Sequence, residues 1–251
     1  MVVGIEKFRE HFAGHEDQYA LIGGAACDLL FAAAGLDFRA TKDLDVVLCV
    51  EVVRDEFAQA FLRFVESGGY QARQRQDGHR EFYRFQKPTD KAYPYMIELF
   101  ARQPEGLELP AEFQITKIPV DQDVISLSAI LLEDEYYAAL TNSKVIVDGI
   151  SLLNEELLIP FKARAYLDLS GRREKGERID SRTVTKHRND VFRLMQLLTA
   201  DSKVAVSEAI RRDLRAFRNS LMQDDAFEPN SFGVQLSRDE GLDVLAQVYA
   251  L

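Results

Sequence analysis

Residues 21–48, LIGGAACDLLFAAAGLDFRATKDLDVVL, contain the pattern from which the fold is predicted. The apolar run that ends at Ile22 predicts a short buried strand, and after Gly23-Gly24 an Ala-rich segment predicts a helix that ends at Gly35. Glycines at such a junction let the backbone approach a ligand, and the following helix directs free N–H groups at an anion. The alternative, and the commoner case for a glycine pair alone, is a tight turn that binds nothing.

The triplet Asp43-Leu44-Asp45 leads into an apolar strand. Because strand side chains alternate between faces, Asp43 and Asp45 are expected side by side while Leu44 faces the core. Two adjacent carboxylates repel unless a cation lies between them, and Mg²⁺ binds one or two carboxylates together with substrate phosphates. The alternative is a pair of solvated acids at the start of a strand.

A third acid, Glu98, lies in the apolar run YMIELFA, residues 95–101. Burying a lone glutamate is costly unless it is paired. If this strand lies beside the strand of Asp43 and Asp45, Glu98 completes a set of three carboxylates. The alternative is a glutamate that points outward from a half-exposed strand.

The remaining pattern predicts a mixed α/β (α+β) fold: a sheet with flanking helices, followed by a mainly helical C-terminal half. We expect an α/β core over residues 1–122 and a helical domain over residues 123–251. Further helices are predicted over residues 5–13, 51–70, 154–169, 185–200 and 204–222. Further strands are predicted as a hairpin over 70–87 broken near Asp77-Gly78, and over 115–120.

Composition, charge and absent motifs limit the classes of function that we expect for this chain. The net charge is −10, and no apolar run approaches the roughly 20 residues that span a bilayer. The N-terminal residues resemble no secretory signal, so a soluble cytoplasmic protein without membrane contact is expected. Between Lys162 and Arg193, ten Lys or Arg residues face five Asp or Glu residues, which favours a polyanionic partner there. Neither a GxSxG, a Walker A nor an HExxH motif is present.

The order of these motifs resembles the nucleotidyltransferase superfamily: an apolar residue, Gly-Gly, a helix, Asp-x-Asp on a strand and a third acid on a later strand. The stretch RATKDLD, residues 39–45, is similar to the version in the AbiEii/AbiGii toxin-like family. FKARAYLDL, with Lys162, resembles the lysine motif of that family's helical half. KHRNDVFRL, with Asp190, resembles its aspartate motif.

The resemblance implies transfer of a nucleoside monophosphate from a nucleoside triphosphate (NTP), with pyrophosphate leaving. Asp43, Asp45 and Glu98 would then hold Mg²⁺ or Mn²⁺, and Glu98 could instead act as the base. The amides of Gly23 and Gly24, with Arg39, Thr41 and Lys162, would bind the nucleotide and its phosphates; Asp190 would orient Lys162 or touch the acceptor. Arg39 could equally pair with an acid of the set.

Three functions follow. The first is transfer to tRNA or another RNA in a toxin–antitoxin or abortive-infection system, with a cognate antitoxin protein as partner. The second is modification of a small molecule, as aminoglycoside nucleotidyltransferases carry out. The third is a catalytically inactive binding module. The roles of Lys186, His187 and Arg188 stay open, although His187 is expected to be structural.

Overall fold

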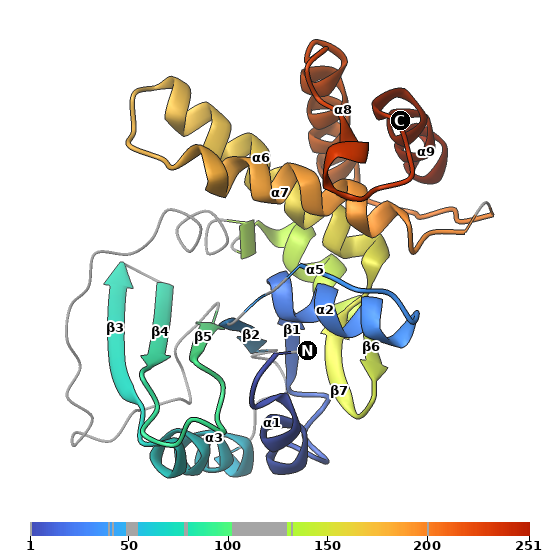
Figure 1. Cartoon of the computed structure of the whole chain (residues 1–251). Coiled ribbons are helices and arrows are strands. Elements are labelled where there is room, and N and C mark those ends of the chain that lie inside the picture. The colour runs from blue at the N-terminus through green and yellow to red at the C-terminus, as the bar shows by residue number, and fades with distance from the viewer. Residues whose placement is uncertain are drawn as a thin grey trace. The chain divides into compact units, whose positions relative to one another are not determined.

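A computed structural model describes residues 2–39, 41, 43–48, 55–77, 80–101, 130–131, 133–199 and 201–251 of the chain (Figure 1). The chain forms two compact units. Unit 1 comprises Met1–Val120 and Ser143–Asn154, and unit 2 comprises Asp121–Asn142 and Glu155–Leu251. The predicted boundary at residues 122 and 123 lies outside the described residues, as does the predicted strand over 115–120, and both stay predictions.

Unit 1 is built on a seven-stranded mixed sheet with the order β3-β4-β5-β2-β1-β7-β6. Pairs β2–β5 and β1–β7 are parallel, and the other neighbouring pairs are antiparallel. The mixed α/β class predicted from the sequence is therefore confirmed. The strands are β1 (Tyr19–Ile22), β2 (Asp43–Leu48), β3 (Gln71–Asp77), β4 (Arg80–Gln86), β5 (Met96–Ala101), β6 (Lys144–Val147) and β7 (Ile150–Leu153).

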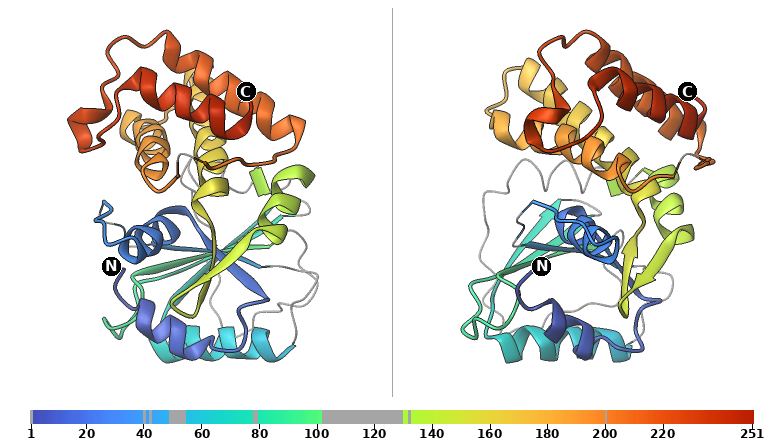
Figure 2. Two further views of the ribbon diagram at one scale, coloured as in Figure 1. Left: turned by 90° about the vertical axis from the view of Figure 1, so that its right-hand side faces the viewer. Right: turned by 45° about the vertical axis from the view of Figure 1, so that its right-hand side comes forward.

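Aromatic side chains hold two helices, α1 (Ile5–His11) and α3 (Asp55–Gly68), on one face of this sheet. Phe8 meets Tyr19 of β1 edge-on, with ring centroids 5.4 Å apart, and Phe61 meets Phe85 of β4 at 5.4 Å. Helix α2 (Gly23–Ala33) lies on the opposite face, as Figure 2 shows in the view along the sheet. Because side chains alternate along a strand, the residue next to Phe85 faces the α2 side.

The chain returns to the sheet after residue 142, which the sequence did not predict. Strands β6 and β7 form a hairpin, and its turn residues Asp148 and Gly149 have φ angles of 49° and 72°. Positive φ at both central residues is typical of a type I′ turn, which Asp-Gly favours. Mainly helical structure was expected from residue 124 onward, and for residues 144–153 this expectation was wrong. A four-residue buried strand is too short for its periodicity to identify it.

Unit 2 is helical, as predicted for the C-terminal half. Its helices are α5 (Asp134–Asn142), α6 (Glu155–Glu174), α7 (Ser181–Met195), α8 (Glu208–Met222), the short 3₁₀ helix η2 (Pro229–Phe232) and α9 (Arg238–Tyr249). Helix α9 was not predicted from the sequence. Among the helices that the structure describes, none combines the length and the apolar character that a membrane crossing requires.

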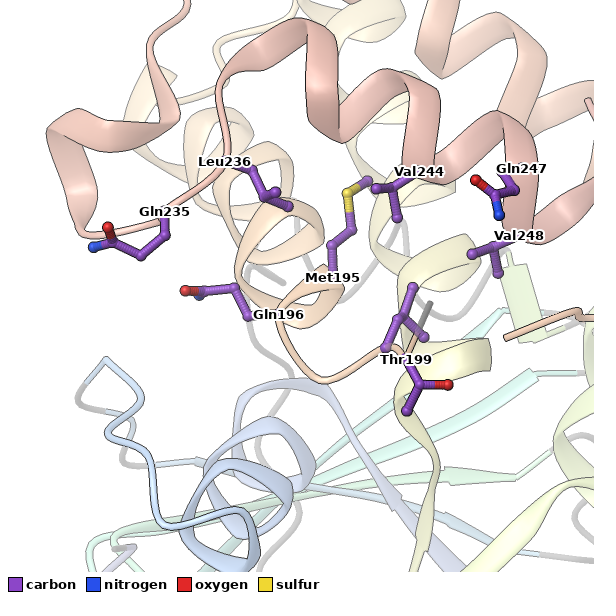
Figure 3. A pocket seen from close by; sticks show the side chains of 9 residues that line it. Met195, Gln196, Thr199, Gln235, Leu236, Val244, Gln247 and Val248 are labelled. Carbon is purple, nitrogen blue, oxygen red and sulfur yellow. The ribbon is translucent and has the colours of Figure 1, made fainter. Parts of the chain in front are cut away.

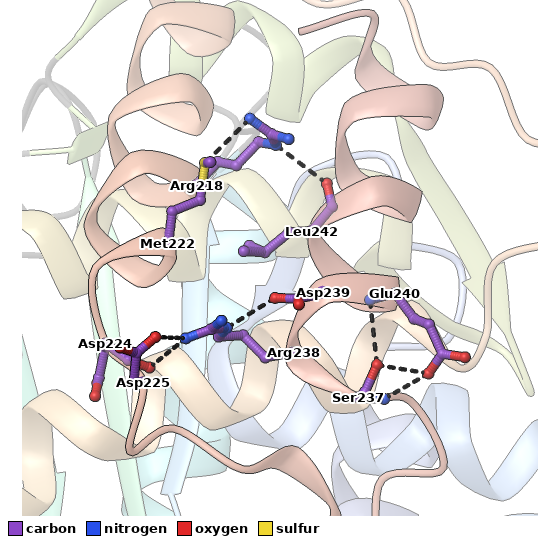
Figure 4. Close-up of polar contacts among 9 residues, drawn as sticks. All are labelled: Arg218, Met222, Asp224, Asp225, Ser237, Arg238, Asp239, Glu240 and Leu242. Atoms are coloured by element: carbon purple, nitrogen blue, oxygen red, sulfur yellow. Dashed lines mark hydrogen bonds and ion pairs between the residues drawn. The ribbon is translucent and has the colours of Figure 1, made fainter.

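Polar contacts at the start of α9 fix its position beside the end of α8 (Figure 4). Ser237 and Glu240 form a capping box, in which each side chain bonds the other residue's backbone N–H. Arg238 Nη1 donates to Asp225 Oδ1 at 2.9 Å, and its Nε donates to Asp239 Oδ1 at 2.9 Å. The cap therefore starts the helix, and the arginine ties it to the loop that follows α8.

Candidate active site

The two aspartates of the Asp-x-Asp motif begin β2, and the strand alternates as the sequence predicts. Leu44 and Val46 have no exposed surface, while Asp43 and Asp45 are half-buried. The two carboxylates therefore lie on the same face of the strand. Asp45 pairs in register with Ile22, directly before Gly23-Gly24. The acids and the glycine turn thus meet at one end of adjacent strands.

Glu98 lies directly opposite Asp45 on the parallel neighbour β5, as the sequence analysis required for a shared site. It is buried, with 6% of its surface exposed. Burial raises the pKa of Glu98 well above its usual range, and the charge and hydrogen bond of Asp45 raise it further. The two acids are therefore in direct contact, and the alternative of a glutamate that points outward is wrong.

Arg84 is a member of this cluster that sequence reasoning missed. It stands opposite Glu98 on β4, on the face turned away from Phe85, and is 6% exposed. Its Nε and Nη2 both donate to Glu98 Oε1, at 2.9 and 2.6 Å. The signal was present, because FYRF, residues 82–85, is an aromatic run with one charge inside it, as YMIELFA is an apolar run with one charge. Two such strands with opposite charges favour a cross-strand pair.

The glycine turn makes close contact with the acids. Gly23 has a φ of +69°, and a Cβ atom built there would overlap Oδ2 of Asp45. A Cβ on Gly24 would lie 2.6 Å from Thr41 Oγ1 and 3.6 Å from Arg39 Nη2. Two predicted phosphate-binding residues, Arg39 and Thr41, are thus brought to the N-terminus of α2. Free N–H groups and the positive end of the helix dipole lie there.

Replacing Gly23 by alanine is expected to destabilise the chain by about 1–3 kcal/mol, because a non-glycine residue at positive φ is strained. The added methyl group must also displace Asp45, so any reaction at this site is expected to fall at least about tenfold. Denaturant unfolding and a transfer assay check the two effects.

Gly35→Ala is the matched control for this substitution. Gly35 has a similar φ of +72°, but a Cβ there meets no atom within 4 Å. It therefore reproduces the backbone strain without moving Asp45. If both variants lose activity equally, the contact between Gly23 and Asp45 has no role.

In unit 2, Lys162 of α6 and Asp190 of α7 form a buried ion pair. Lys162 Nζ lies 3.2 Å from Asp190 Oδ2, and Arg193 Nη1 lies 3.2 Å from Oδ1. Asp190 has no exposed surface, and the Lys162 side chain is 6% exposed. The two motifs that the resemblance singled out are thus brought together. Both oxygens of Asp190 thus contact cations of the same unit, and its role in orienting Lys162 or in touching the acceptor stays a prediction.

The neighbouring residue Arg188 has a structural role. Its Nη1 donates to Asp224 Oδ2 at 2.8 Å, and its guanidinium lies 4.1 Å from the centre of the Phe227 ring. Both partners belong to the segment after α8. His187 is buried on the same helix, which agrees with the structural role expected for it.

Asp43 and Asp45 share one face of β2 and could together hold a metal ion. Within the part of the chain that the structure describes, no group of three or more His, Cys, Asp or Glu side chains is arranged to hold a metal. The three-carboxylate metal set of Asp43, Asp45 and Glu98 therefore stays a prediction, since Glu98 is engaged by Arg84 and Asp45. Two carboxylates completed by phosphate oxygens and water are nevertheless a set that suits Mg²⁺.

The raised pKa of Glu98 predicts a pH dependence of stability in the metal-free chain. The folded state retains a proton that the unfolded state releases near pH 4.3, so stability declines as pH rises from there through the folded pKa, by up to about 1.4 kcal/mol per unit. Glu98→Gln, which mimics the protonated side chain, removes this slope. Urea unfolding of both chains between pH 5 and 9 measures it; parallel stability curves would contradict the assignment.

A separate cavity of about 380 Å³ lies in unit 2, between α7, α9 and the loop before α9 (Figure 3). Met195, Val244 and Val248 form its apolar side, and Gln196 and Gln247 are among its polar lining. It contains none of the residues predicted to carry chemistry. The cluster of charged residues on β2, β4 and β5 is the stronger candidate, because reactions of phosphates need cations and carboxylates.

No family model matches the sequence, and no curated protein matches it. Among solved structures, the chain is similar to the crystal structure of an antigenic nucleotidyltransferase-like protein from Paracoccidioides brasiliensis. The two share 16% sequence identity with a TM-score of 0.49, over 98% of this chain and 95% of that one.

Proposed function

We propose that this chain is a metal-dependent nucleotidyltransferase that moves a nucleoside monophosphate from an NTP to an acceptor. The contact between the Gly23-Gly24 turn and Asp45 supports the proposal best, since it joins a phosphate-binding element to a carboxylate. Asp43 on the same strand face and Glu98 on the next strand complete the arrangement. The order of the same motifs in the sequence supports it independently.

In this proposal Asp43 and Asp45 hold Mg²⁺ or Mn²⁺ together with the triphosphate. The bound ion neutralises charge that develops on the phosphate oxygens and lowers the pKa of an attacking hydroxyl. The N–H groups of Gly23 and Gly24 bind the outer phosphates, and Arg39 and Thr41 lie near Gly24 for the same purpose. A cation held at Asp45 would offset the negative charge that raises the pKa of Glu98, so that Glu98 orients Asp45 and accepts the acceptor's proton.

Lys162 has a double role in the proposal. Its pairing with Asp190 stabilises unit 2, and the resemblance of its motif supports a contact with the triphosphate. A lysine is a compact point charge that suits phosphate, and a carboxylate partner fixes its ammonium group. Asp190 acts only through Lys162.

For the acceptor, we propose an RNA such as tRNA. Several cations between Lys162 and Arg193 are engaged within unit 2, as Arg172 is by Asp168 and Glu177. The exposed ones gather at the end of α6, the following turn and the start of α7: Arg173, Lys175, Arg178 and Arg182. A cluster of this kind attracts a polyanion. The likeness of RATKDLD to the AbiEii/AbiGii toxin-like family supports a toxin setting with an antitoxin partner.

Incubation of the chain with labelled NTPs, Mg²⁺ and total RNA tests the proposal. Label is expected in RNA, and chelation of the metal is expected to abolish transfer. Label that enters aminoglycosides but not RNA would replace the RNA acceptor by a small molecule. Absence of transfer, together with absence of NTP and Mg²⁺ binding by calorimetry, would reject the enzyme in favour of an inactive binding module.

A further inference from the structure

A row of charged groups crosses the sheet of unit 1 at the candidate site. Arg84 on β4 pairs with Glu98 on β5, Glu98 pairs with Asp45 on β2, and Asp45 lies against Gly23 at the start of α2. The order is therefore a cation, two acids and the positive end of a helix dipole. The row has a cation at one end that the sequence motifs do not include.

The bond pattern of Arg84 is asymmetric. Nε and Nη2 both donate to Oε1 of Glu98, at 2.9 and 2.6 Å. Neither bond uses Oε2, the second oxygen of the same carboxylate. Two charge-assisted donors on one oxygen hold that oxygen more firmly than a single donor does. Arg84 therefore holds Glu98 through Oε1, and these two bonds do not engage Oε2.

We infer that Arg84 is a positioning residue of the reaction: it holds Glu98 through Oε1 so that the other oxygen faces Asp45 and the reacting groups. This inference rests on the proposed function. Both side chains are 6% exposed, so water screens the charges of the pair only weakly. Without Arg84, the ionised form of Glu98 faces Asp45 with no cation to offset their repulsion.

The inference can be tested without an activity assay. The test compares the stability lost on substitution of Arg84 in chains with and without Asp45. Arg84→Met is expected to lower the unfolding temperature of the full chain by about 10 °C, since a buried charge loses its partner. In a chain that already carries Asp45→Asn, the loss is expected to be less than half of that, because the repulsion from Asp45 is gone. Equal losses in the two backgrounds would overturn the inference.

Steady-state kinetics separate a positioning role of Arg84 from an effect of Arg84 on folding. At a temperature where all variants are folded, Arg84→Met is expected to lower kcat about 10- to 100-fold, while KM for the NTP changes less than about threefold. Arg84→Lys keeps the charge but not the two-donor fork, so it is expected to recover part of kcat. An unchanged kcat in Arg84→Met would overturn the inference. A rise in KM for the NTP by the same factor as the fall in kcat would overturn it too.

Arg63→Met is the control, because Arg63 is an exposed arginine on α3, across the sheet. It is expected to change neither the unfolding temperature nor kcat. If the unaltered chain transfers no nucleotide, the proposed function fails, whereas the coupling between Arg84 and Asp45 still decides whether Arg84 positions Glu98.

Discussion

Asp45→Asn is expected to lower the rate of nucleotide transfer by about 1,000-fold or more. Asp45 contacts both the glycine turn and Glu98. A metal ligand that loses its charge removes several kcal/mol of transition-state stabilisation, and each 1.36 kcal/mol is tenfold in rate. Steady-state transfer of label from NTP measures the effect.

The same substitution is expected to leave the fold intact or to stabilise it. An asparagine amide can donate to Glu98, and the repulsion between the half-buried Asp45 and the buried Glu98 disappears. Activity should therefore fall while stability stays the same or rises, as at active sites whose functional residues destabilise the fold. Asp37→Asn, at an exposed aspartate in the loop before β2, is the control and should change neither. More than a tenth of the activity left in Asp45→Asn would contradict its role.

Lys162→Met is expected to lower the free energy of unfolding by about 3 kcal/mol, the lower end for a broken buried ion pair. The lower end applies because Arg193 still contacts the other oxygen of Asp190. The loss is large beside a total stability of roughly 5–15 kcal/mol. Denaturant unfolding measures it. Lys175→Met, at an exposed lysine just after α6, is the control and should change stability by less than about 0.5 kcal/mol.

Asp190→Asn separates the structural role of the pair from a phosphate role of Lys162. Both single variants break the ion pair, but only Lys162→Met removes the ammonium group. At a temperature where both are folded, Lys162→Met should raise KM for the NTP more than Asp190→Asn does. Equal KM values would show that Lys162 serves stability alone, and a stability loss under about 1 kcal/mol would show that the pair is not the buried contact described here.

Local sequence patterns were sufficient to predict much of the structure of unit 1. The strand that ends at Ile22, the glycine turn, helix α2 and the alternation of Asp43, Leu44 and Asp45 follow from periodicities of 3.6 and 2 and from turn chemistry. The hairpin of β3 and β4 and the strand that carries Glu98 were likewise predicted. For these elements the information lies within about ten neighbouring residues.

Strand pairing decided which charged residues meet at the candidate site and where the short strands form. Arg84 and Glu98 are fourteen positions apart, and only the order β4-β5-β2 brings an arginine, a glutamate and Asp45 into one row. The short strands β6 and β7 are stabilised by pairing with β1 and with each other rather than by their own propensity. The sequence by itself thus determined which acids and glycines form a candidate site. Tertiary structure decided which partner each acid has, because contacts between strands depend on register and no local pattern encodes them.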